Sequence, residues 1–404
     1  MDNSAAAPPP SSPAATAHPS ATLFRYALGI ISGLAIAAGC GGGTTNGSTI
    51  PPNQPAATPT ISTAPAQNGA VIVTLSDTTS GATIYYTIDS SAPTTSSIRY
   101  FAPFLVASNL TVKAIAAAPP LLNSAVATQA FTPNIPSGTL VWSDEFANSG
   151  SANAQPNPST WKYDTGTDCC GNHELETYCA WGSTTSPCTP TSPNAFIGTD
   201  GYLHVVALNP SANVYTSARL KSQGLFSFQY GRIEARMMLP ESQGMWPAFW
   251  LLGNNITTVS WPACGEADIM EHIDGNNPPP DVGAPAPGYD WIAGSVHGGT
   301  TSNHADGSQQ FHPAAFSAAA WHSYGMIWSK GQVQYYVDDP TNIYATFNTG
   351  NFNGTNSSSA WPFDQGPMFI ILNLAVGGDW PGNPNASTLF PGNMLVDYVR
   401  IYTN

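Results

Sequence analysis

The sequence predicts an all-β protein made of a small Ig-like β-sandwich followed by a large two-sheet β-sandwich. Gly and Pro each occur 37 times among the 404 residues, which favours short strands joined by tight turns. Alternating apolar runs recur between the turn residues, and no long amphipathic helical pattern competes with them. The clearest runs lie at 71–75, 84–88, 110–116, 233–239, 332–338 and 394–402.

Residues 1–39 are predicted to be a targeting segment rather than part of the fold. An apolar run at 26–38 follows Arg25 and is too short to span a bilayer comfortably. Small residues then precede Cys40, which resembles a bacterial lipoprotein signal in which Cys40 would carry lipid. The pattern departs at Ala37, where Leu or a similar residue is usual, so plain secretion is the alternative. Both alternatives predict export, to the cell envelope or the extracellular space.

A flexible linker at 40–57, rich in Gly, Thr, Asn and Pro, is predicted to lead into the small sandwich at 58–133. The segment 82–94 resembles the small C-terminal domain of chitobiase-type β-hexosaminidases, which implies a spacer. The alternative is sugar binding through exposed aromatic side chains, with Tyr85, Tyr86 and Tyr100 as the candidates.

Charge and aromatic content indicate the kind of partner. The formal net charge of −14 and the pI of about 4.6 argue against nucleic acid and against electrostatic attachment to anionic membranes. Only 8% of residues are charged, while 11 Trp and 16 Tyr are present. Aromatic faces and polar side chains suit a neutral polymer such as a polysaccharide. We expect a monomer that meets a membrane only through the lipid that Cys40 could carry.

Three carboxylates within six positions form the central motif of the chain, at Glu266, Asp268 and Glu271. On a helix they could not converge, whereas on a strand Glu266 and Asp268 share a face. Strict alternation would put Met270 on that face, so a β-bulge near Ile269 and Met270 is needed to return Glu271 to it. The sequence therefore predicts a bulged strand with three carboxylates in a row.

Two carboxyl groups that flank one bond are what glycoside hydrolysis requires. The pattern Glu-x-Asp-x-x-Glu resembles the signature of glycoside hydrolase family 16, in the bulged form of its laminarinase-like members. The resemblance runs from about Leu140 to the C-terminus and implies a catalytic domain at 138–404 with a curved β-jelly roll and a cleft across its concave face. The other motifs that carry it are LVWSDEF at 140–146, GNHELE at 171–176, YGRIEAR at 230–236, GMWPAFW at 244–250 and NLAVGG at 373–378.

The geometry and the resemblance together assign roles to the three carboxylates. Glu266 is the expected nucleophile and Glu271 the expected general acid/base of a retaining enzyme. Asp268 is expected to hydrogen-bond a Glu and to help keep one carboxyl protonated, because three close negative charges are unfavourable. The alternatives are a solvated acidic edge strand, or a metal site that includes His272. His272 should point away from the row if the bulge is present.

Substrate contacts are expected from tryptophans and from positions that match the family. Trp246 and Trp250 would share a strand face beside the carboxylates, and Trp261 and Trp380 lie in Gly- and Pro-rich loops. Core packing is the alternative for each Trp, and a structural role is the alternative for the histidine. The residues that match sugar-contacting positions of the family are Asn172, Glu174, Arg219, His297 and Asn373.

No cofactor is expected for catalysis, but family members often bind a structural calcium ion on the convex face. Asp397 and the backbone near Glu145 match that place, and an ordinary strand aspartate is the alternative.

The cysteines agree with export. Cys179 and Cys188 bracket a short loop, so a local disulfide is plausible there, although sequence alone cannot give pairing. Cys264 is expected to be a buried free thiol or to pair with Cys169 or Cys170. Zinc binding by the adjacent Cys169 and Cys170 is a weaker alternative.

The sequence thus predicts an exported, retaining endo-β-glucanase that cleaves internal β-1,3 bonds of laminarin-type or mixed β-1,3-1,4 glucans. One alternative keeps the site and changes the reaction, to a galactanase or a transglycosylase. Another is a non-catalytic glucan-binding protein, which the presence of both Glu266 and Glu271 disfavours.

Overall fold

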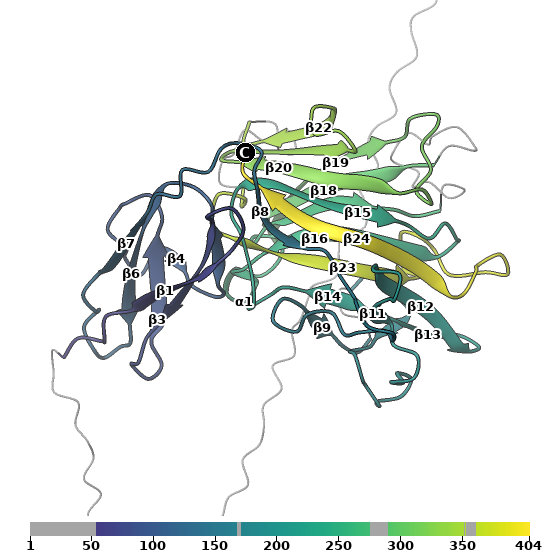
Figure 1. Cartoon of the computed structure of the whole chain (residues 1–404), viewed down its shortest axis with the longest axis horizontal. Helices are drawn as coiled ribbons and strands as arrows, with labels where there is room; N and C mark the ends of the chain where they lie inside the picture. Colours follow the sequence, from purple (N-terminus) through teal and green to yellow (C-terminus); the bar gives the residue numbers. More distant parts are fainter. Residues whose placement is uncertain (1–53, 168–170, 275–289, 351, 353–360) are drawn as a thin grey trace, which may run out of the picture. The chain divides into compact units, whose positions relative to one another are not determined.

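The computed structural model describes residues 54–167, 171–274, 290–350, 352 and 361–404. These residues form 24 strands and one short helix, α1 (Ile256–Val259), which confirms the all-β prediction (Figure 1). The predicted targeting segment, most of the predicted linker, Cys169 and Cys170 lie outside the described residues. None of the helices in the described part is long and apolar enough to cross a membrane.

The small sandwich pairs a three-stranded sheet with a four-stranded sheet, and its core lies between them. Val73, Val112 and Ala114 are fully buried there because alternate residues of each strand point inward. The three-stranded sheet has the order β1 (Thr60–Pro65), β2 (Val71–Ser76), β5 (Phe104–Val106). The four-stranded sheet has the order β4 (Ile98–Arg99), β3 (Thr83–Thr87), β6 (Leu110–Ala117), β7 (Ala127–Phe131).

The tyrosines of the small sandwich mainly serve packing. Tyr86 is only 2% exposed and stacks on Phe104 at a centroid distance of 4.9 Å. Tyr100 packs against the same core and meets Tyr86 edge to face. Sugar binding through Tyr86 is therefore wrong, because its ring is buried, whereas Tyr100 is half-buried and its role stays a prediction. Tyr85 is half-buried, and its role stays a prediction.

The large sandwich consists of a ten-stranded and a seven-stranded sheet. The ten-stranded sheet contains β10 (Glu176–Tyr178), β13 (Val214–Ser217), β12 (Leu203–Ser211), β24 (Gly392–Tyr402), β15 (Gly231–Met238), β20 (His322–Ser329), β21 (Gln332–Val337) and β22 (Ile343–Asn348), with β11 (Ala195–Ile197) beside β12 and β8 (Leu140–Asp144) beside β24. The seven-stranded sheet has the order β19 (Asn303–Phe311), β18 (Ile292–Thr300), β17 (Glu266–Glu271), β16 (Met245–Gly253), β23 (Met368–Val376), β14 (Arg219–Lys221), β9 (Lys162–Asp164).

One hydrophobic core fills the space between these two sheets. From β16 it receives Met245, Phe249 and Leu251, each of them fully buried. The alternate residues of β16, Trp246 and Trp250, belong to two smaller clusters on the other face of the sheet. The seven-stranded sheet therefore has a core face and an outer face, and the outer face carries aromatic side chains.

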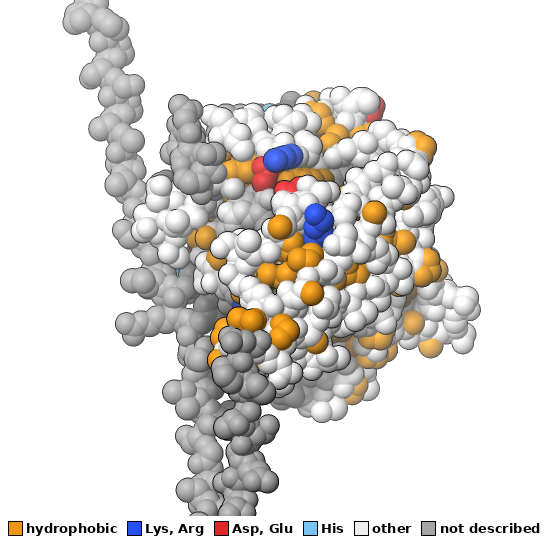
Figure 2. All heavy atoms as spheres, turned by 90° about the vertical axis from the view of Figure 1, so that its left-hand side faces the viewer, with side chains coloured by type: hydrophobic (Ala, Val, Ile, Leu, Met, Phe, Trp, Pro, Cys, Tyr) orange, Lys and Arg blue, Asp and Glu red, His pale blue; other side chains and the backbone are white. Residues whose placement is uncertain are grey.

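The low charge density of the sequence is visible on the surface. In the view of Figure 2, a few Lys, Arg, Asp and Glu side chains lie among uncharged and hydrophobic groups. That face shows no broad field of either sign, which suits a molecule whose charged residues make up 8% of the chain.

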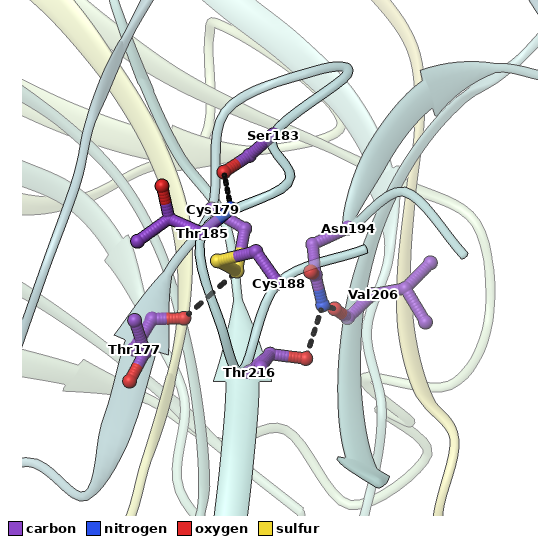
Figure 3. The surroundings of a disulfide bond; sticks show 8 residues. All are labelled: Thr177, Cys179, Ser183, Thr185, Cys188, Asn194, Val206 and Thr216. Atoms are coloured by element: carbon purple, nitrogen blue, oxygen red, sulfur yellow. Dashed lines mark hydrogen bonds between the residues drawn. A yellow bond between two sulfur atoms is a disulfide. The ribbon is translucent and has the colours of Figure 1, made fainter. Parts of the chain in front are cut away.

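The plausible local disulfide forms between Cys179 and Cys188, whose Cα atoms are 5.7 Å apart (Figure 3). Beside it, the Asn194 amide donates hydrogen bonds to the Val206 carbonyl and the Thr216 hydroxyl. The loop that follows β10 is thus closed covalently. Cys264 is a buried free thiol, and its burial raises its pKa to about 12.

Candidate active site

Strand β17 carries the three carboxylates, and its pairing with β16 contains the predicted bulge. Trp250 lies opposite Asp268 and Phe249 lies opposite Met270, so Ile269 has no partner in the register. The pairing of β17 with β18 shifts at the same place. The bulge near Ile269 and Met270 is therefore confirmed.

The bulge sorts the side chains of β17 between the two faces of the sheet. Glu266, Asp268 and Glu271 lie opposite Leu252, Trp250 and Ala248, which are alternate residues of the outer face of β16. The residues between the carboxylates join the large core, and these are Ala267, Ile269 and Met270. The structure thus brings the three predicted catalytic residues together in one row.

Burial gives all three carboxyl groups unusual proton affinity. Desolvation is the largest cause that raises the pKa of Glu266, Asp268 and Glu271, in each case to about 8. The negative charge of Asp268 raises the pKa of both glutamates further. Each of the three carboxyl groups therefore binds its proton more tightly than a carboxyl group in water does.

Two side chains from neighbouring strands contact this row. The Trp246 indole donates a hydrogen bond of 3.0 Å to Glu271 Oε1. His297, which lies opposite Glu266 in the register, places Nε2 at 3.2 Å from Asp268 Oδ2 and 3.9 Å from Glu266 Oε1. The sequence placed His297 near the acid/base, whereas in the structure it contacts Asp268 and Glu266.

His272 points away from the carboxylates, as the bulge predicts. It is 1% exposed, and its Nδ1 lies 2.8 Å from the Trp291 carbonyl oxygen. The metal site that the sequence offered as an alternative therefore cannot include His272.

Tryptophans line the sheet on both sides of the row. Near Glu271, the Trp246 ring meets the Trp380 ring edge to face at 5.3 Å. On the other side, the half-buried Trp261 lies in the segment that precedes β17 and packs against His304 at 4.8 Å. The rings supply apolar surface beside the carboxylates, as stacking on sugar rings requires.

Trp250 anchors a third group of predicted residues. Its indole donates a hydrogen bond of 2.7 Å to Asn373 Oδ1, and the Arg219 guanidinium lies 4.6 Å from the centre of its ring. Arg219 also pairs with Asp164 on the edge strand β9. Arg219 and Asn373 therefore belong to the same outer face as the carboxylates.

Asn172 and Glu174 connect to this group through Tyr178, a residue that the sequence did not single out. The Asn172 amide donates to Glu174 Oε1 at 3.2 Å, and the Tyr178 hydroxyl donates to Glu174 Oε2 at 3.3 Å. The Asn373 amide in turn donates to the Tyr178 hydroxyl. A continuous network thus runs from the loop before β10 to the outer face of the sheet.

Glu176 is a second residue that sequence reasoning missed. It is 1% exposed and accepts a hydrogen bond of 2.7 Å from the Val376 backbone N–H. Burial, followed by the charge of Glu174, raises the pKa of Glu176 to about 8. A carboxyl group in a chain with so few charges was a signal, but only the fold shows that it is buried.

The two residues expected to bind structural calcium each contact an arginine instead. Asp397 Oδ2 accepts a hydrogen bond of 2.6 Å from Arg236, and both carboxylate oxygens of Glu145 accept from Arg400, at 3.0 and 2.8 Å. The guanidinium groups neutralise both carboxylates, so these side chains as arranged do not fit a calcium ion.

Two family models match the chain. The model described as "Glycosyl hydrolases family 16" matches residues 189–400. The model described as "Fn3 associated" matches residues 73–131, within the small sandwich, where the sequence alone indicated the chitobiase C-terminal type.

Individual relatives and solved structures match the same C-terminal part. The chain is 37% identical over 275 residues to a beta-glucanase of Rhodothermus marinus, covering 66% of this chain and 86% of that protein. It is 32% identical over 265 residues to a keratan-sulfate endo-1,4-beta-galactosidase of Sphingobacterium multivorum, covering 65% and 54%. The catalytic domain of an endo-1,3-beta-glucanase (laminarinase) from Thermotoga petrophila matches with a TM-score of 0.53 and 32% identity, covering 67% of this chain and 99% of that one.

Proposed function

The chain belongs to glycosyl hydrolase family 16 and is a glycoside hydrolase with the jelly-roll fold of that family, and we propose that it cleaves internal β-1,3 bonds of laminarin-type glucans with retention. The observation that carries the proposal is the row of Glu266, Asp268 and Glu271 on the outer face of the sheet, with half-buried tryptophans on both sides. Two carboxyl groups beside a sugar-binding surface are the equipment of a glycosidase.

In the first step, Glu271 donates its proton to the glycosidic oxygen while a carboxylate oxygen of Glu266 attacks the anomeric carbon. The bond between that carbon and the leaving sugar breaks, and a glycosyl ester forms on Glu266. In the second step, the Glu271 carboxylate takes a proton from water, whose oxygen attacks the anomeric carbon and releases Glu266. The raised pKa of Glu271, about 8, keeps the proton available near neutral pH.

Asp268 acts through its neighbours rather than on the sugar. It lies between the two glutamates on the same face, and its charge raises the pKa of each. His297 Nε2 lies 3.2 Å from Asp268 Oδ2. Asp268 therefore makes it unfavourable for both glutamates to be ionised at the same time.

A neutral β-glucan is the substrate class that the surface supports best. The described outer face offers indole rings and amide groups, with Arg219 already paired to Asp164. The relatives from Rhodothermus and Thermotoga carry glucanase names, and the Sphingobacterium relative carries a galactosidase name. A galactan is therefore the second candidate, and substrate comparison decides between them.

We further propose that the chain is exported and works as a monomer, anchored by lipid on Cys40 or fully secreted. The apolar run at 26–38 and the small residues before Cys40 support export, and the Cys179–Cys188 disulfide suits an oxidising compartment. Mass spectrometry of the mature N-terminus tests this. An acylated Cys40 supports anchoring, a lipid-free cleaved terminus supports secretion, and a chain that keeps Met1 contradicts export.

At the place where a structural calcium ion was expected, we propose ion pairs in its stead. Asp397 and Glu145 would have to give up Arg236 and Arg400 to bind an ion. We propose that these ion pairs, which join β15 and β8 to β24, replace a bound ion at that place. Treatment with EDTA should then leave the thermal midpoint unchanged, and a clear fall would contradict the proposal.

Product analysis on laminarin, lichenan, agarose and carrageenan tests the proposed activity. The wild-type chain should release short glucose oligomers from laminarin, and Glu266→Ser and Glu271→Gln should each lower the rate by about 10³-fold or more. Cleavage of a galactan alone would keep the chemistry and overturn the substrate. Glucan binding without cleavage by the wild type would overturn the enzymatic proposal.

A further inference from the structure

We propose that Glu266, Asp268 and His297 form a binding site for Zn²⁺, and that the bound ion blocks the nucleophile and inhibits the enzyme reversibly. The binding part stands on the geometry of these three side chains alone. The inhibitory part rests on the proposed function, because it requires Glu266 to be the group that attacks the sugar.

The three side chains come close enough to share one ion. One ligand atom from each lies within 4.8 Å of the other two. His297 Nε2 is 3.2 Å from Asp268 Oδ2 and 3.9 Å from Glu266 Oε1. Ligands about 2.0–2.2 Å from a tetrahedral zinc ion are about 3.4 Å apart, so small side-chain adjustments complete the geometry. Among the described residues, this is the one group of three or more His, Cys, Asp and Glu with such spacing.

The sheet holds these ligands without any rearrangement of the backbone. Glu266 and His297 are directly opposite each other on β17 and β18, and Asp268 is two residues along on the same face. Sites built on strands are more rigid than sites built on loops, so little ordering is needed on binding.

One carboxylate oxygen of Asp268 has no hydrogen-bond donor in this group. Asp268 is 4% exposed, and its Oδ2 atom has no hydrogen-bond donor although it faces His297 Nε2. A buried carboxylate oxygen without a donor is costly, and a cation beside it removes that cost. Outside the group itself, the charges that act on Glu266 come from Glu271 on the same strand and from Arg219.

His304 lies where it can accept the ring hydrogen that a metal-bound histidine usually donates. Its Nε2 lies 3.3 Å from His297 Nδ1, on the far side of the ring from the carboxylates. When His297 Nε2 binds a metal ion, its Nδ1 must carry the hydrogen and can donate it to His304. Trp261 packs against both imidazole rings and limits their motion.

The types of ligand favour Zn²⁺ over other ions, and the partial exposure of the site lets a bound ion block Glu266. Imidazole with two carboxylates suits Zn²⁺, whereas Ca²⁺ and Mg²⁺ prefer oxygen ligands alone. The side chains of Glu266 and His297 are 18% and 24% exposed, so an ion can enter from the outer face. Once bound, it occupies the oxygen that would attack the anomeric carbon, and glucan and Zn²⁺ should compete.

Calorimetric titration of the full chain with ZnCl₂ at pH 7 tests the site directly. The wild type should bind one ion at this site, His297→Gln should lose it, and His304→Gln should weaken binding about 10-fold or more. His322→Gln is the matched control, because His322 also pairs with an aspartate, Asp338 at 2.8 Å, but lies elsewhere. It should bind Zn²⁺ and cleave laminarin like the wild type.

Two further readouts separate this site from other metal binding and from the proposed activity. With Co²⁺ as the probe, the wild-type spectrum should show no thiolate charge-transfer bands, because none of the three ligands is a cysteine. Such bands, if they persisted in His297→Gln, would indicate metal binding elsewhere. On laminarin, Zn²⁺ should raise KM with little change in kcat, and EDTA should reverse the effect. Unchanged binding in His297→Gln, or no binding by the wild type, would overturn the site. Binding without inhibition would overturn only its inhibitory role. A wild type that cleaves no glucan would refute the proposed function, while calorimetry still decides the site.

Discussion

Asp268 acts electrostatically on both glutamates of the row. It is almost fully buried between them, its charge raises the pKa of both, and its own pKa is raised to about 8 by desolvation. The folded chain therefore carries protons on this row that the unfolded chain has already lost. Between the ordinary carboxyl range and about pH 8, the free energy of unfolding should fall as pH rises.

Replacing Asp268 with Asn should separate the effect of its charge on catalysis from the stability that is lost when that charge is buried. Asn cannot ionise, so the free energy of unfolding at pH 8 should rise by roughly 2 kcal/mol, while kcat on laminarin should fall about 100-fold. Denaturant titrations at pH 5 and pH 8 measure the first effect. If wild type and variant lost stability in parallel between these pH values, the buried carboxyl would not be the cause.

Trp246 acts on Glu271, the proposed general acid, through a single hydrogen bond. Its indole donates a hydrogen bond of 3.0 Å to Glu271 Oε1. This bond favours the ionised carboxylate, so it lowers the pKa of Glu271 and opposes the effect of burial. Trp246→Phe should raise that pKa, so the alkaline limb of kcat/KM should move up by about half a pH unit. Trp250→Phe is the control, since its indole donates to Asn373 instead. Equal shifts in both variants would refute the link.

At the scale of the element, β17 depends on how it begins. Gly265 precedes the strand with φ of +84°, and a Cβ atom there would lie 2.8 Å from Pro362 Cγ. Gly201 has nearly the same φ, +83°, but open space where its Cβ would be. The pair separates the cost of backbone conformation from the cost of close packing.

Gly265→Ala should therefore destabilise the protein more than Gly201→Ala does. We expect losses of about 3 kcal/mol and about 1 kcal/mol respectively, measured by chemical denaturation. The activity of Gly265→Ala should also fall, because Glu266 follows directly. Equal losses in stability would show that Pro362 yields easily and that packing does not fix the start of β17.

The bulge in β17 shows what could be predicted from sequence. Glu266, Asp268 and Glu271 can share a face only if one residue is inserted, so their spacing alone required the irregularity that the register contains. By contrast, Tyr178 lies in a three-residue strand and reaches the site through contacts with Glu174 and Asn373. No local pattern encodes such contacts, because they depend on how distant strands are brought together.

The calcium site stays a prediction, and the arginine contact of Asp397 could not be read from the sequence for a related reason. Asp397 stands at the family position, but its partner Arg236 comes from another strand, and alternation along either strand does not show that the two will meet. For the tyrosines of the small sandwich the preferred interpretation was packing in a spacer domain, and the burial of Tyr86 agrees with it. Alternation gave the right strands, but whether Tyr86 faced solvent or core depended on Phe104.

At the scale of the whole molecule, low charge density matches a neutral substrate. The chain carries 10 Lys and Arg and 24 Asp and Glu, and the face in Figure 2 shows only a few of these charged groups. Binding of laminarin should then involve no ion pairs that dissolved salt could screen. We expect kcat/KM on laminarin to change less than about twofold between roughly 0.05 and 0.5 M NaCl. A steep fall with salt would indicate an anionic substrate instead.

The division of labour between Glu266 and Glu271 is the central claim, and the configuration of the products formed with azide tests it most directly. On an aryl β-glucoside oligomer, a Glu266→Gly variant lacks the nucleophile, so azide should attack the sugar itself and give the α-azide. A Glu271→Ala variant still forms the glycosyl ester, which azide should open to the β-azide. The reverse pattern, or no rescue of either variant by azide, would contradict the assigned roles.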